Sequence, residues 1–91
     1  MVKVVKKMEI KNKLGVHALA AALLVQTVNR FSAQVTISKD GQTADGRSIM
    51  GVLMLAATQG STIEVEAAGQ DAEQAVKAIE KLIDKRFNEN E

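Results

Sequence analysis

The single histidine of the chain, His17, is the leading candidate for chemistry. It follows Leu14-Gly15-Val16 and comes directly before an apolar segment that is expected to form a helix. The first amide groups of a helix lack partners within it and the helix dipole places positive potential there, so this point favours an anion. The same potential disfavours a charged imidazolium, which leaves a ring nitrogen available as a nucleophile. We therefore expect His17 to accept a phosphoryl group; the alternative is a histidine that only caps the helix or packs beside it.

Ser48 is the second residue whose type and place suggest a role. It ends the turn Asp45-Gly46-Arg47-Ser48 and precedes an apolar segment that is expected to be helical from Ile49 to about Leu55. A serine hydroxyl at this place accepts a hydrogen bond from an amide of the first helical turn, which contributes about 1 kcal/mol. The sequence therefore predicts that Ser48 caps a short helix.

The hydrophobic pattern predicts the elements that position these residues. Helices are expected over 18–30 and 49–55, and from a cap at Asp71, followed by Gln74 in a capping-box pattern, through to Phe87. Alternating apolar and polar residues predict strands over 2–11, with Lys6 as an exception to the alternation, and over 33–38, 42–45 and 62–67. Asp40-Gly41 predicts a hairpin turn between the second and third strands.

The predicted order of elements is β-α-β-β-α-β-α. Three helices that each carry one apolar stripe need a shared surface, and a four-stranded antiparallel sheet offers one on a single face. The sequence thus predicts a two-layer α+β fold with three helices on one face. A ferredoxin-like fold has the same first six elements, so the pattern alone leaves both topologies open.

Composition excludes several functional classes. The chain has 91 residues, which predicts a single domain over 1–91, and its net charge of +1 argues against nucleic acid as a partner. It has no cysteine, so thiolate metal sites and cysteine nucleophiles are excluded, and we expect neither a metal nor a cofactor. The longest apolar stretch, 18–25, is far shorter than a membrane span. A soluble cytoplasmic protein is expected.

Four segments together resemble one known family. They are the run Leu14-Gly15-Val16-His17-Ala18 and the segments 45–55, 59–61 and 69–71. Their order and spacing are similar to those of HPr, the histidine-containing phosphocarrier family of the sugar phosphotransferase system. The resemblance covers nearly the whole chain and implies the HPr open-faced β-sandwich, four antiparallel strands covered on one side by three helices.

The resemblance also implies a function. His17 matches the histidine that enzyme I phosphorylates at Nδ1, with a phosphoryl group taken from phosphoenolpyruvate. In the family, this histidine then passes the group to EIIA domains. The protein would be a covalent carrier in a relay and not an enzyme. Ser48 matches a serine that a kinase/phosphorylase modifies to regulate the carrier, where a phosphate would add roughly −1.5 to −2 charges at a helix start. The family expectation for the oligomeric state is a monomer.

An apolar surface around the histidine is expected to bind these partners, because a cluster of exposed apolar residues on a small protein marks a docking site. Leu53 is expected to face the core instead, and the pattern leaves Val52 and Met54 open. The residues expected to contact partners are Val16, Leu19, Ala20, Arg47, Ile49 and Met50.

The chain departs from the family pattern two and three residues after the histidine. HPr proteins usually carry Arg-Pro where this chain has Leu19-Ala20. A guanidinium beside a phosphoryl group contributes roughly 1.5–3 kcal/mol through charge-assisted hydrogen bonds, so its loss would change the stability of the phosphohistidine or the rate of transfer by about ten- to more than a hundredfold. Arg47 and Arg86 are the candidates to replace it.

Other functions remain open at this point. The chain could be an HPr-like regulatory module that acts through the Ser48 surface with impaired phosphotransfer, or an enzyme that uses His17 as a general base. Among carriers, a nitrogen-regulatory branch is an alternative to sugar uptake.

Overall fold

The computed structural model describes residues 2–89 and has the predicted order of elements. The third helix is followed by one short 3-10 turn, η1. The elements are β1 (Lys3–Glu9), α1 (Ala18–Val28), β2 (Gln34–Lys39), β3 (Gln42–Asp45), α2 (Ile49–Met54), β4 (Thr62–Ala68), α3 (Ala72–Asp84) and η1 (Arg86–Asn88).

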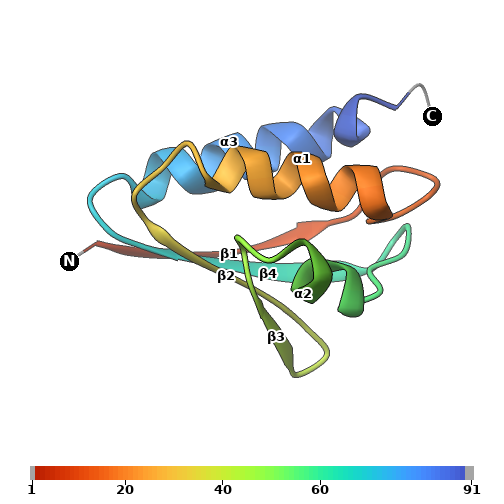
Figure 1. Cartoon of the computed structure of the whole chain (residues 1–91), viewed down its shortest axis with the longest axis horizontal. Coiled ribbons are helices and arrows are strands. Elements are labelled where there is room, and N and C mark those ends of the chain that lie inside the picture. Colours follow the sequence, from red (N-terminus) through yellow and green to blue (C-terminus); the bar gives the residue numbers. More distant parts are fainter. Residues whose placement is uncertain (1, 90–91) are drawn as a thin grey trace.

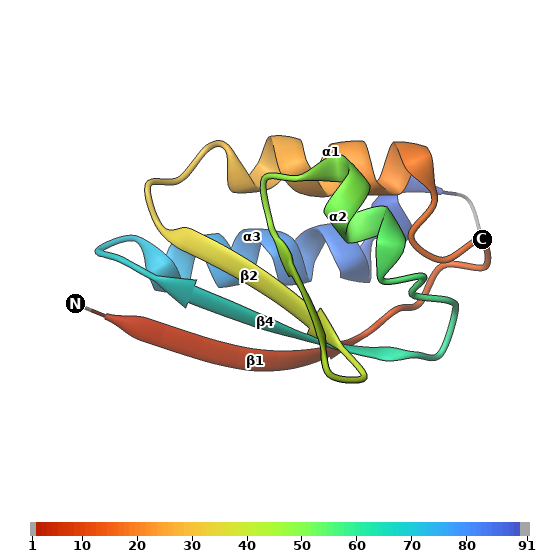
Figure 2. The same ribbon diagram turned by 60° about the horizontal axis from the view of Figure 1, so that its bottom comes forward.

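The four strands form one antiparallel sheet in the order β1-β4-β2-β3. The last strand of the sequence, β4, therefore lies between the first and the second. All three helices lie on one side of this sheet, with α1 and α3 side by side, and α2 lies over the side that carries β3 (Figures 1 and 2). The opposite face of the sheet is open. The α+β sandwich expected from the sequence is thus confirmed.

The core lies between the sheet and the helices. Because side chains alternate along β4, Ile63, Val65 and Ala67 point toward the helices. The apolar stripe of α3 packs against this face of the sheet. The largest completely buried apolar side chains are Ile10, Leu24, Val28, Val35, Ile37, Val65, Ile79 and Ile83.

Two helices end before the residues predicted from the sequence. The first helix stops at Val28, and the amides of Arg30 and Phe31 donate to carbonyl groups only three residues back, which tightens the chain into a turn. The third helix stops at Asp84, and Phe87 is buried outside it with φ of +53°. The apolar periodicity placed Phe87 correctly in the core but wrongly in the helix.

Asp71 acts differently from the predicted capping box. It is the N-cap of α3, yet its side chain makes no capping hydrogen bond. Its two carboxylate oxygens accept from the backbone amides of Ser32 and Ala33, each at 2.8 Å. Asp71 therefore fastens the start of β2 to the start of α3.

The exception predicted at Lys6 has a physical reason. Lys6 points to the helix side of β1, where its ammonium group forms an ion pair with Glu80 of α3, while Val5 is exposed. No helix in residues 2–89 is long and apolar enough to cross a membrane.

Candidate functional site

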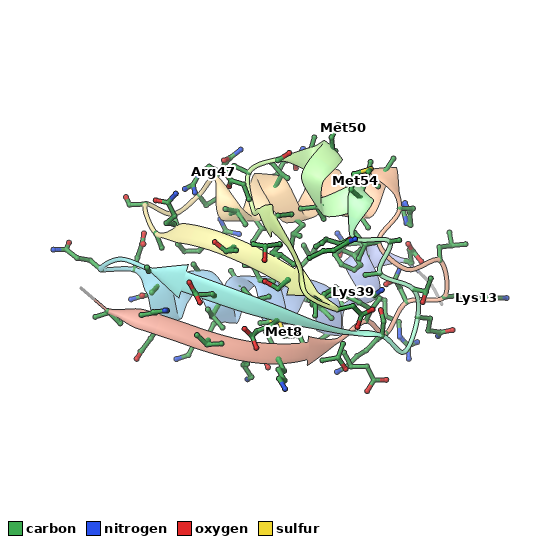
Figure 3. All side chains as sticks on the ribbon, turned by 90° about the horizontal axis from the view of Figure 1, so that it is seen from below. Met8, Lys13, Lys39, Arg47, Met50 and Met54 are labelled. Carbon is green, nitrogen blue, oxygen red and sulfur yellow. The ribbon has the colours of Figure 1, made fainter. Side chains whose placement is uncertain are left out.

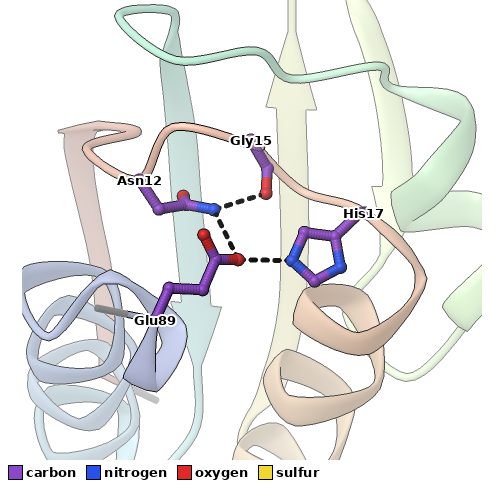
Figure 4. Close-up of polar contacts among 4 residues, drawn as sticks. All are labelled: Asn12, Gly15, His17 and Glu89. Atoms are coloured by element: carbon purple, nitrogen blue, oxygen red, sulfur yellow. Dashed lines mark hydrogen bonds and ion pairs between the residues drawn. The ribbon is translucent and has the colours of Figure 1, made fainter. Parts of the chain in front are cut away.

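His17 is the N-cap of α1, where extended backbone joins the helix. Its carbonyl accepts the first helical hydrogen bond from the Ala21 amide at 2.8 Å, but its side chain does not cap the helix. The ring is turned toward the C-terminal segment instead, and the side chain is 30% exposed (Figure 4). The imidazole is thus at a helix start and accessible, as the sequence predicted.

The loop before His17 is held by Gly15. Its φ of +68° is in the left-handed region, and a Cβ atom there would lie 2.5 Å from the carbonyl oxygen of Ala57. The next residue, Val16, donates its amide to that same oxygen at 2.8 Å. Only glycine lets the loop approach this closely, so Gly15 fixes the position from which His17 enters the helix.

A polar network of Asn12, His17 and Glu89 surrounds the ring (Figure 4). Asn12 is completely buried, and its Nδ2 donates to the Gly15 carbonyl at 2.7 Å and to Glu89 Oε2 at 3.1 Å. The same carboxylate oxygen is hydrogen-bonded to His17 Nε2. Because a carboxylate can only accept, Nε2 carries a proton in this contact. No atom of residues 2–89 is hydrogen-bonded to Nδ1.

Sequence reasoning missed Asn12 and Glu89. Asn12 lies in a segment that was interpreted only as a loop, and no local pattern marks it as buried. Glu89 is 72 residues from His17 in the chain, beyond the last predicted helix. Only the packed tertiary structure brings the three side chains together.

The network also affects the ionisation of Glu89. The hydrogen bond from His17 holds the pKa of Glu89 below its usual value of 4.5, and the Asn12 amide, the charge of a protonated His17 and the Leu14 amide act in the same direction. Partial burial opposes them. The carboxylate is therefore ionised throughout the neutral range.

No arginine of residues 2–89 replaces the guanidinium that is missing beside His17. Arg47 donates to the carbonyls of Phe31 at 2.7 Å and Ala33 at 3.2 Å, beyond the far end of α1 from His17. The expectation for Arg47 as a substitute is therefore wrong. Arg86 is exposed, and the described residues include no hydrogen bond or ion pair from it to His17.

Ser48 is the N-cap of α2, as predicted. Its Oγ accepts a hydrogen bond from the Gly51 amide at 2.9 Å, and the residue is half-buried. A Cβ atom at position 51 would lie 3.0 Å from this oxygen, so glycine leaves room for the cap. The hydroxyl is positioned at the surface beside exposed apolar residues.

The structure exposes four of the six residues predicted to bind partners and buries the other two. Val16 and Ala20 are buried in the core, because Val16 follows the loop that Gly15 pins and Ala20 lies on the sheet-facing side of α1. Leu19 is 62% exposed and Met50 67% exposed, and Ile49 is also exposed. Arg47 is also exposed, and its side chain lies apart from that of Met50 (Figure 3).

Other positions near the helices are now settled. Leu53 is partly buried against the core and Val52 is buried, whereas Met54 is exposed on α2 (Figure 3). Leu14, which the sequence did not single out for docking, is exposed in the loop before His17. The large apolar residues exposed in this loop, α1 and α2 are Leu14, Leu19, Ile49, Met50 and Met54.

A family model now adds to this geometry. The model described as "PTS HPr component phosphorylation site" matches residues 4–85. The chain belongs to the HPr family. HPr proteins are phosphocarriers of the phosphotransferase system, so the family is one of relay proteins in sugar transport.

Known HPr proteins are similar along most of the chain. The HPr of Cupriavidus necator is 49% identical over 80 residues, which cover 88% of this chain and 90% of that protein. The HPr of Xylella fastidiosa strain Temecula1 is 44% identical over 84 residues, covering 92% and 94%. A crystal structure of HPr from Thermoanaerobacter tengcongensis is similar with a TM-score of 0.90 and 43% identity, covering all of both chains.

One similar structure is an assembly. It is described as an HPr dimer from Thermoanaerobacter tengcongensis, with a TM-score of 0.77 and 45% identity, covering 90% of this chain and 94% of that one. The expectation of a monomer for this HPr therefore stays a prediction.

Proposed function

We propose that this HPr accepts a phosphoryl group on Nδ1 of His17 from enzyme I and passes it to EIIA domains. The observation that supports this most directly is the ring itself, which is partly exposed at the start of α1 with Nε2 hydrogen-bonded to Glu89 and Nδ1 free among residues 2–89. The attacking lone pair is thus on the nitrogen that the family uses.

The helix start supports the phosphorylated state. In residues 2–89, no acceptor is hydrogen-bonded to the backbone amides of Ala18, Leu19 and Ala20, the first three of α1. Amide groups of this kind, together with the helix dipole, stabilise an anion near the N-cap. A phosphoryl group on His17 therefore has local stabilisation although Leu19 supplies no charge.

The proposed function is tested by phosphorylation of the purified protein. It is incubated with phosphoenolpyruvate and enzyme I, and the added mass is located by mass spectrometry. We expect an acid-labile phosphate on His17 and none on a His17→Ala variant. Phosphate on a serine only, formed with ATP and a serine kinase, would instead support the alternative of a regulatory module.

We further propose that Ser48 is a regulatory phosphorylation site for an ATP-dependent kinase/phosphorylase. The residue is half-buried at the start of α2, where its Oγ accepts a hydrogen bond from the Gly51 amide. A phosphate there would place roughly two negative charges beside Ile49 and Met50, which weakens docking of an apolar partner surface. The relay with enzyme I and EIIA also implies a location in the cytoplasm.

Ser48 variants separate capping from charge. We expect Ser48→Ala to lower the free energy of unfolding by about 1 kcal/mol because the cap is lost, and Ser48→Asp to keep most of it because aspartate also caps helices well. Only Ser48→Asp is expected to slow His17 phosphorylation by enzyme I. Denaturant unfolding and initial transfer rates measure the two effects; equal rates in both variants contradict the proposed regulation.

A further inference from the structure

We propose that Glu89 is a positioning residue for His17: its carboxylate holds the proton on Nε2, so that the lone pair that accepts the phosphoryl group stays on Nδ1. This inference rests on the proposed function. Its basis is the hydrogen bond between Glu89 Oε2 and His17 Nε2, in which the glutamate side chain is only 18% exposed (Figure 4). Neither the sequence pattern nor the family resemblance assigned a role to this residue.

The tail is held over the ring by contacts that do not involve His17. Beyond α3 the chain makes a short turn through Arg86–Asn88, whose three residues all have positive φ. Phe87 is buried in the core and anchors this turn. Asn12, itself completely buried, then donates to Glu89 Oε2 at 3.1 Å and to the Gly15 carbonyl at 2.7 Å. Glu89 is therefore placed by the fold and is not a solvated side chain that meets the ring by chance.

The contact affects acceptance of the phosphoryl group. The Nδ1 lone pair forms the new N–P bond, while the bond between phosphorus and the donor breaks and its electron pair returns to the donor. The Nε2 proton does not move, and the ring gains positive charge as the bond forms. A carboxylate hydrogen-bonded to Nε2 stabilises that charge more in the transition state than in the neutral ring.

The contact also affects donation to the next protein. When the N–P bond to Nδ1 breaks, its electron pair returns to the ring. Because Glu89 keeps Nε2 protonated, the ring leaves as neutral imidazole; a ring without that proton would have to leave as imidazolate, a far poorer leaving group. One fixed carboxylate thus assists both half-reactions at a site where Leu19 provides no cation.

The experiment compares four proteins: wild type, Glu89→Ala, Glu89→Gln and the matched control Glu73→Gln. Glu73 is an exposed carboxylate on α3 for which residues 2–89 provide no ion pair. The rate of phosphoryl transfer from enzyme I to His17 and from His17 to EIIA is measured, together with the low-field NMR signal of the His17 Nε2 proton and its correlation with Nε2.

We expect Glu89→Ala to lose the Nε2 proton signal and to slow both transfers by about ten- to a hundredfold, the effect of one charge-assisted hydrogen bond. Glu89→Gln keeps an uncharged acceptor and is expected to retain part of the rate, and Glu73→Gln to match wild type. Wild-type transfer by Glu89→Ala, or a slow Glu89→Ala with its Nε2 signal unchanged, overturns the proposal.

Failure of the proposed function is distinguishable from failure of this inference. If the wild type takes no phosphate on His17, the carrier function fails, although the Nε2 signal still reports the contact. If wild type and Glu89→Ala are phosphorylated equally fast, only the positioning role fails. A thermal unfolding curve of each variant shows whether the tail also contributes to stability. A change in stability by itself alters neither the Nε2 proton signal nor the ratio of the two transfer rates.

Discussion

At the scale of single residues, Leu19 determines how this HPr differs from the family pattern. Its side chain is 62% exposed at the start of α1, two residues after His17 in the chain, and neither Arg47 nor Arg86 contacts the ring within residues 2–89. The phosphoryl group on His17 would therefore rely on backbone amides and not on a side-chain cation.

Restoring the missing charge should speed transfer. We expect Leu19→Arg to raise the rate of His17 phosphorylation by about tenfold or more, because a guanidinium stabilises the transferring group by roughly 1.5–3 kcal/mol. Val5→Arg adds the same charge to an exposed residue of β1, away from the residues expected to bind partners, and is the control. Equal acceleration by both variants would attribute the effect to net charge and contradict a local role for position 19.

Asn12 is the residue whose loss should most disturb the site. It is completely buried, and its amide nitrogen donates both to the Gly15 carbonyl and to Glu89. Within the described residues, Glu89 is otherwise held to this loop only by His17 and the Leu14 amide. Asn12→Ala leaves the Gly15 carbonyl without this donor, so we expect a loss of about 1–3 kcal/mol in the free energy of unfolding, measured with urea. An unchanged urea midpoint would show that water replaces the amide.

At the scale of elements, the sequence correctly predicted the features that depend only on residues close together in the chain. The Ser48 cap, the bounds of β3 and the Asp40-Gly41 turn depend on neighbours within a few residues, and all three are confirmed. The end of α3 was wrong because burial of Phe87 depends on the rest of the core, which periodicity alone cannot separate from helix continuation. Asp71 was misassigned for the same reason, since the backbone amides that donate to its carboxylate lie in the segment before β2.

Gly15, in the loop before α1, and Gly41, in the turn between β2 and β3, can be compared as a matched pair. Gly15 and Gly41 both have positive φ, but a Cβ atom at Gly41 meets nothing within 4 Å, whereas at Gly15 it meets the Ala57 carbonyl at 2.5 Å. We expect Gly41→Ala to cost about 1–2 kcal/mol from backbone strain alone, and Gly15→Ala to cost at least about 1 kcal/mol more and to slow His17 phosphorylation. Equal unfolding free energies would show that the loop yields without cost.

At the scale of the whole molecule, the site joins a segment near the beginning of the chain to its last described residue. Residues 12–17 connect β1 to α1, and Glu89 follows the turn after α3. The candidate site therefore forms only when α3 has packed on the sheet. This explains why the histidine and its helix could be predicted from the sequence whereas its polar partners Asn12 and Glu89 could not.

The junction should depend on pH in one direction. Because the pKa of Glu89 is lowered in the folded protein, its contribution to stability is present above its usual value of 4.5 and is lost as the pH falls through the lower folded value. We expect the His17 Nε2 proton signal to persist at pH 4.5 and to broaden below it. Disappearance of the signal well above pH 5 would contradict the lowered pKa.

The edges of the sheet favour a single copy in solution. The edge strand β1 carries Lys3, Lys6 and Lys7, and charged lysines on an edge oppose pairing with a second sheet. We expect light scattering to give the mass of a monomer, about 9.8 kDa, at micromolar concentration. A mass of twice that value would place this HPr with the dimeric structure described above.

The tail contact has a practical consequence for handling the protein. β1 begins at the end of the sheet far from the start of α1, whereas Glu89 touches the reactive ring (Figure 2). An affinity handle joined after residue 91 begins three positions beyond that glutamate and would compete for the space that partners need. Recombinant versions intended for kinetic work should therefore carry their purification sequence ahead of Met1.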